Sequence, residues 1–104
     1  MDHTQDLAPI VSITMLEIRE ELPSIDPEVL SKDDVVTILL HLFEAKGGFI
    51  NRGHECNNNE TAWVNAVLYR LERGRNADGM ESYIVKKVGT SADKAAKLKP
   101  LANQ

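Results

Sequence analysis

The stretch of sequence that decides the fold reads SKDDVVTILLHLFEAKGG and spans residues 31–48. Ser31 can accept a hydrogen bond from a free backbone N–H of a first helical turn, and the acidic Asp34 favours the positive end of a helix. The apolar residues that follow cover about 200° of a helical wheel at ~100° per residue. Gly47 and Gly48 can end the helix. Because so wide an apolar surface is packed on most sides, the stretch predicts a central helix over residues 32–46.

Two later segments carry the same kind of helix-start signal. Residues 57–60 and 78–81 each place Asn or Asp shortly before a glutamate, and each precedes an apolar run. Short polar side chains of this kind cap helices by accepting from backbone N–H groups. We therefore predict a helix over residues 59–73, broken by Gly74, and a shorter one over residues 80–88.

The N-terminal region predicts one further helix. Its apolar residues recur at helical spacing, and Pro23 stops the pattern after about residue 22. Residues 11–15 also alternate as a strand would, so the pattern is mixed. Residues 26–30 predict a short helical turn that begins at Asp26-Pro27, and residues 91–99 predict a weak helix.

Together these elements predict an all-α fold, a compact bundle of four to five short helices, with room for a minor β-hairpin near residues 49–56. A chain of 104 residues, 42% hydrophobic and 27% charged, fits one globular domain. We assign residues 7–99 to this helical domain, residues 1–6 to a flexible N-terminus and residues 100–104 to a flexible C-terminal tail.

Charge and cysteine content restrict the location and the partners. Residues 1–50 carry ten acids and three bases, a net charge of −7, whereas residues 51–104 carry six acids and nine bases, a net charge of +3. The acidic total of −4 argues against broad, non-specific nucleic-acid binding.

Cys56 is the only cysteine, so an intrachain disulfide is excluded and a reducing cytoplasm is expected. The apolar residues 7–16 are too few for a membrane span and lack a preceding positive charge, so no membrane association is expected.

Catalytic and metal motifs give no positive prediction. His54, Cys56 and Glu60, with His41, are metal-ligand types, but they lack the paired spacing that structural zinc sites show. A nucleophilic Cys56 served by His54 has equally little support. We predict no catalytic residues, no metal and no cofactor, and a non-enzymatic protein.

Candidate partner-binding residues lie on two of the predicted helices. Asn65, Tyr69 and Arg73 would follow one another at intervals of four on the outer side of the 59–73 helix, and Tyr and Arg are favoured in protein interfaces. The alternative is that Tyr69 packs against the C-terminal helix. Ile10 and Ile13 lie outside the main stripe of the first helix, where another helix, a partner or a second copy in a homodimer would bury them.

Basic residues define a second candidate surface. They gather late in the chain at Arg70, Arg73, Arg75, Lys86 and Lys87. They would compensate the negative end of the 59–73 helix, or form a patch for an anion or a nucleic acid. The twelve-residue connection at 47–58 is too long for a helix-turn-helix motif.

The sequence thus favours a cytoplasmic protein-binding module that acts as a regulator, inhibitor or adaptor through helix surfaces. Its size is typical of accessory proteins from phages and mobile elements. The alternative is a nucleic-acid-binding regulator that uses the basic C-terminal half.

Overall fold

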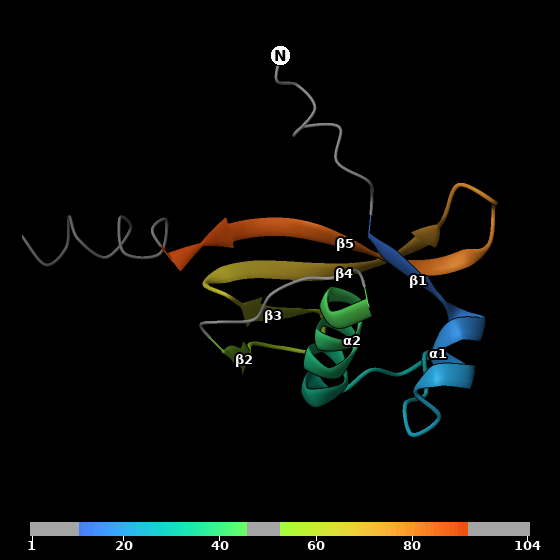
Figure 1. Ribbon diagram of the computed structural model, residues 1–104, viewed down its shortest axis with the longest axis horizontal. Helices are drawn as coiled ribbons and strands as arrows, with labels where there is room; N and C mark the ends of the chain where they lie inside the picture. Colours follow the sequence, from blue (N-terminus) through green and yellow to red (C-terminus); the bar gives the residue numbers. More distant parts are fainter. Residues whose placement is uncertain (1–10, 46–52, 92–104) are drawn as a thin grey trace, which may run out of the picture.

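A computed structural model of the chain describes residues 11–45 and 53–91. It shows a five-stranded antiparallel sheet and two helices that lie on the same side of it (Figure 1). The all-α prediction is therefore wrong. The elements, in chain order, are β1 (Ser12–Thr14), α1 (Met15–Glu21), α2 (Lys32–Ala45), β2 (His54–Cys56), β3 (Thr61–Val64), β4 (Val67–Arg75) and β5 (Glu81–Thr90).

The sheet has the strand order β1-β5-β4-β3-β2, and each neighbouring pair is antiparallel. Residues directly opposite each other share a face of a sheet. The face toward α2, which we call the helix face, carries Ala62, Val64, Tyr69, Leu71, Arg73 and Tyr83. The other face, which we call the open face because no described helix covers it, carries Trp63, Leu68, Arg70, Glu72, Ile84 and Lys86.

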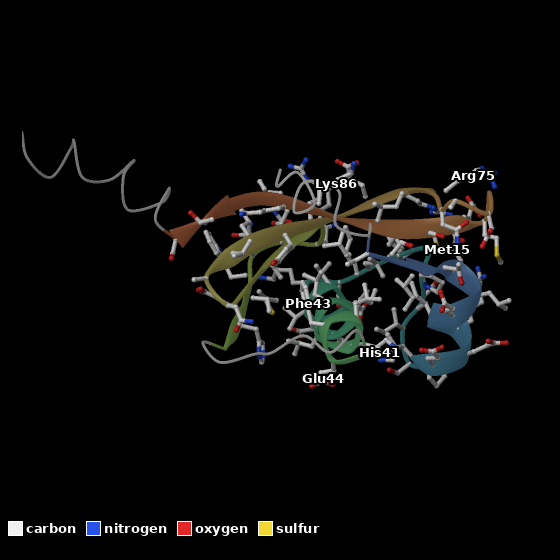
Figure 2. The ribbon with its side chains drawn as sticks, turned by 45° about the horizontal axis from the view of Figure 1, so that its top comes forward. Met15, His41, Phe43, Glu44, Arg75 and Lys86 are labelled. Carbon is white, nitrogen blue, oxygen red and sulfur yellow. The ribbon has the colours of Figure 1, made fainter. Side chains whose placement is uncertain are left out.

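The predicted helix over residues 32–46 is present as α2 and supplies much of the core. Its buried residues are Val35, Val36, Ile38, Leu39 and Leu42. They pack with Ala62, Val64 and Leu71 of the helix face in one hydrophobic cluster. The rings of Phe43 and Tyr69 lie 5.0 Å apart. Figure 2 shows Phe43 between α2 and the sheet, and Glu44 on the outer side of α2.

The predicted helices over residues 59–73 and 80–88 are wrong, because polar residues at or just before their expected starts make turns between strands. The side-chain oxygen of Asn58 accepts from the backbone N–H groups of Glu60 and Thr61, at 2.8 Å each. Asn76 accepts in the same way from Asp78 and Met80, at 2.9 and 3.0 Å. Asn and Asp side chains use the same acceptor in a helix cap and in a turn, so the local signal is ambiguous.

The N-terminal helix prediction is also wrong over its first part. Residues 12–14 form β1, in agreement with the alternation noted for residues 11–15, and the helix α1 begins only at Met15. A capping box fixes this boundary: Thr14 Oγ1 accepts from the Glu17 N–H at 2.9 Å, and Glu17 Oε1 accepts from the Thr14 N–H at 2.8 Å.

Several other predictions concern short or terminal segments. Residues 26–30 form a turn, in which Asp26 Oδ1 accepts from the Glu28 N–H at 2.9 Å, and no helix. The hairpin predicted near 49–56 is instead formed by β2 and β3, over residues 54–64. Residues 1–6 and 100–104, Ile10 and nearly all of the weak helix over 91–99 lie outside the described residues. Within the described residues, no helix is long and apolar enough to cross a membrane.

Candidate functional site: a cleft at an open strand edge

Two neighbouring strands of unequal length leave part of a strand edge open. β3 begins at Thr61, which lies opposite Arg70, whereas β4 continues to Arg75. The last bond on this side joins the Leu71 N–H to the Glu60 carbonyl, at 2.9 Å. In Figure 1 the ribbon of β4 and β5 continues past the end of β3. Among residues 11–45 and 53–91, no strand pairs with this edge beyond Leu71.

The backbone of Arg73 points toward this open edge. In an antiparallel strand, the N–H and C=O of a residue point to the same side, and successive residues point to opposite sides. Since Leu71 donates toward β3, Arg73 is directed the same way, and Glu72 is directed toward β5. The bond from the Val85 N–H to the Val11 carbonyl, at 2.9 Å, supports this pattern, because it directs Ile84 of β5 toward Glu72.

A cleft of about 440 Å³ lies along the open edge. One wall is the turn that precedes α2, and the other is the end of β4 with the residues before β3. The lining residues are Glu28, Val29, Leu30, Asn59, Glu60, Arg70, Leu71, Glu72, Arg73 and Tyr83.

The turn that forms the first wall is fastened to the sheet. The Tyr83 hydroxyl donates to the Pro27 carbonyl at 2.7 Å. Arg73 Nη2 lies 2.9 Å from Glu28 Oε1, and Arg19 Nη2 lies 3.4 Å from Glu28 Oε2. Burial raises the pKa of the Tyr83 hydroxyl above its usual range. These contacts hold the wall in a fixed position beside β4.

The two walls differ in polarity. On the helix-face side, Val29 is 73% exposed and stands next to Leu30 at the cleft. On the open-face side lie Arg70 and Glu72, whose side chains approach only to 3.8 Å. The buried Nε of Arg70 has no hydrogen-bond partner among the described residues. The cleft therefore combines an apolar wall, a polar wall and a backbone edge.

The predicted partner-binding residues do not form one stripe. Asn65 lies in the tight turn between β3 and β4, where its φ is 53° and that of Ala66 is 67°. Tyr69 packs on Phe43 of α2, and nearly all of the C-terminal helix that the alternative invoked lies outside the described residues. Arg73 alone lines the cleft. Ile13 is 2% exposed and belongs to the core.

The basic residues are also dispersed. Arg70 and Lys86 lie opposite each other on the open face, whereas Arg73 and Lys87 belong to the helix face. Arg75 donates from Nη1 to the Gly79 carbonyl at 2.7 Å, at the far end of the ribbon. Figure 2 shows Lys86 and Arg75 well apart along it. They do not converge into a single positive patch.

The candidate metal-ligand residues are separated as well. His41 lies on the side of α2 that faces α1, with its Nε2 2.7 Å from Glu21 Oε1. His54 and Cys56 are exposed on β2. Among the described residues, no three histidine, cysteine or acidic side chains come together in an arrangement that could hold a metal ion.

Cys56 is coupled to α2. Its Sγ donates to Asp33 Oδ1 at 3.1 Å, and this hydrogen bond is the main cause of a raised thiol pKa. A raised pKa lowers the thiolate fraction, and the thiolate is the reactive form. We therefore expect Asp33→Asn to lower the pKa of Cys56 and to speed its reaction with an aromatic disulfide reagent at pH 8. Glu44→Gln on the same helix serves as the control, and equal rates in the two variants would contradict this account.

Sequence reasoning missed most of the cleft. Glu28, Val29, Glu60 and Tyr83 meet there from three separate segments. The local sequence signal for the cleft was Asp26-Pro27, which favours a turn. Val29 follows in this turn and is exposed.

Compared with known proteins, the chain matches no protein-family model, no curated protein and no solved structure.

Proposed function

We propose that this protein is a non-enzymatic protein-binding module, acting as a regulator, inhibitor or adaptor, and that it accepts an extended segment of its partner along the open edge of β4. The observation that carries the proposal is the backbone of Arg73 directed into a cleft with fixed walls. An extended segment added to an open sheet edge gains main-chain hydrogen bonds, and the neighbouring pockets select its side chains.

The two outer edges of the sheet are less suitable. β1 and β2 have three residues each. β2 also carries the exposed Glu55 in its centre. Short and charged edge strands are features that prevent pairing with other chains. The edge of β4 is longer and lies inside a cleft, so we assign the binding site there.

The proposal includes a cytoplasmic location and another protein as the partner. The location rests on the free thiol of Cys56, which suits a reducing compartment. Nucleic acid receives less support, because the basic residues are divided between two faces of the sheet and have carboxylates beside them. The binding surface that we propose is a sheet edge, in place of the helix surfaces predicted from the sequence.

A comparison of two exposed valines tests the proposal. Val29 stands at the cleft, whereas Val88, which is 44% exposed, lies on β5 outside it. The immobilised chain is used to capture proteins from the native cytoplasm, and each captured protein is quantified by mass spectrometry. We expect Val29→Asp to reduce recovery of the partner about tenfold, equivalent to about 1.4 kcal/mol, and Val88→Asp to leave it unchanged.

The outcome that would contradict the proposal is a captured set that does not depend on Val29. Both valines are exposed, so thermal melts of the two variants are expected to match the wild type. Recovery of the partner is also expected to survive moderate salt, whereas a phosphate-binding surface would lose affinity steeply.

A further inference from the structure

We infer that the segment bound in this cleft is an extended peptide in which two aliphatic residues flank an asparagine or glutamine. The inference rests on the proposed function and specifies its partner. Its basis is the difference between the two walls of the cleft.

The alternation follows from the geometry of the sheet. A segment paired with the edge of β4 continues the pleat, so its side chains point in turn to the helix face and to the open face. β4 itself shows this order, with Leu71 and Arg73 on the helix face and Arg70 and Glu72 on the open face. Because the Leu71 N–H already bonds to the Glu60 carbonyl, the open edge runs from Glu72 to Arg75 and seats about four residues, which extend about 13 Å at ~3.3 Å each.

The helix-face positions of the bound segment meet an apolar wall. Val29 is largely exposed there, and Leu30 lies beside it. The charged groups on this side, Arg73 and Glu28, are already paired with each other at 2.9 Å, and Arg73 also lies 3.5 Å from Glu81. An aliphatic side chain covers Val29 and leaves these ion pairs in place, so two aliphatic residues separated by one position fit this wall.

The open-face position meets a polar wall with both donors and acceptors. Arg70 offers a guanidinium whose only ion pair among the described residues, with Glu72, is long at 3.8 Å. Glu72 offers carboxylate oxygens on the same face. A side-chain amide accepts from Arg70 and donates to a carboxylate, which neither Asp nor Lys can do alone. An acidic residue would face the carboxylate of Glu72, so this charge favours an amide over a carboxylate at the open-face position.

A displayed library of random heptapeptides, sorted against the full chain, tests this specificity. We expect the enriched peptides to share two aliphatic residues that flank Asn or Gln. Val29→Asp should weaken these peptides about tenfold, and Val88→Asp should not. Arg70→Met should remove the preference for the amide and keep the preference for the aliphatic residues, whereas Lys86→Met, on the same face outside the cleft, should change neither.

Two results would overturn the inference, and only the second would also overturn the proposed function. Peptides that depend on Val29 but lack the central amide would overturn the inferred partner chemistry and leave the proposed function standing. A library in which no enriched peptide depends on Val29 would overturn the proposed function as well. Matching thermal melts for all four variants separate these results from a loss of folding.

Discussion

Replacing Leu39 by alanine is expected to lower the free energy of unfolding by about 2–5 kcal/mol. Leu39 is fully buried on α2, within the cluster that joins this helix to β3 and β4. Truncation removes buried methyl groups and leaves a cavity that a closely packed core closes only in part. For a domain of this size, such a loss is a large fraction of the total stability. Denaturant unfolding followed by circular dichroism measures it.

The matched control lies on the opposite side of the same helix. His41 contacts Glu21, and the two side chains are 29% and 48% exposed. Exposed pairs of this kind contribute at most about 1 kcal/mol, so His41→Ala should cost far less than Leu39→Ala. A larger loss for His41→Ala would mean that α2 does not present Leu39 to the sheet.

The helix α2 could be predicted because its evidence is local. Its apolar residues, its first-turn acids and its glycine stop all lie within residues 31–48, and the structure places the helix over Lys32–Ala45. No distant partner is needed to recognise such a pattern. The same reasoning failed for β4 and β5, whose pairing joins residues such as Leu71 and Val85 across a turn.

Turn-forming asparagines explain why helices were wrongly predicted over residues 59–73 and 80–88. Asn58 and Asn76 accept hydrogen bonds from backbone N–H groups two to four residues ahead, as a helix cap would do. The residue after the polar side chain distinguishes a turn from a helix cap. Gly79 has a φ of 80°, a left-handed value that closes a turn and does not start a helix. The sequence Asp78-Gly79 was therefore better evidence for a hairpin than for a cap.

The candidate site was even less accessible to sequence reasoning. Arg70 and Arg73 were singled out as charged residues, but the chemistry of the cleft depends on which face each one occupies. In a helix, residues three apart lie on neighbouring positions, whereas in a strand they point to opposite faces. Val29 and Tyr83 join the site only through the folded chain, because the Tyr83 hydroxyl holds the turn at Pro27.

The proposed binding site depends on the hydrogen-bonding state of single backbone amides. Glu72 and Arg73 are neighbours on β4, but the N–H of Glu72 points to β5 and that of Arg73 points to the cleft. An amide bonded within a sheet exchanges its hydrogen only when the strands separate, whereas an amide at an open edge exchanges without such opening. Both residues lie away from the ends of the strand, so fraying affects them similarly.

Residue-resolved amide hydrogen exchange of the free protein measures whether the Arg73 N–H is unpaired. We expect Arg73 to exchange at least about a hundredfold faster than Glu72, since opening of a paired strand costs several kcal/mol. An amide-containing peptide selected on the cleft should then slow Arg73 and leave Glu72 unchanged. Equal protection of Glu72 and Arg73 in the free protein would show that the edge of β4 is already paired, and would contradict the account.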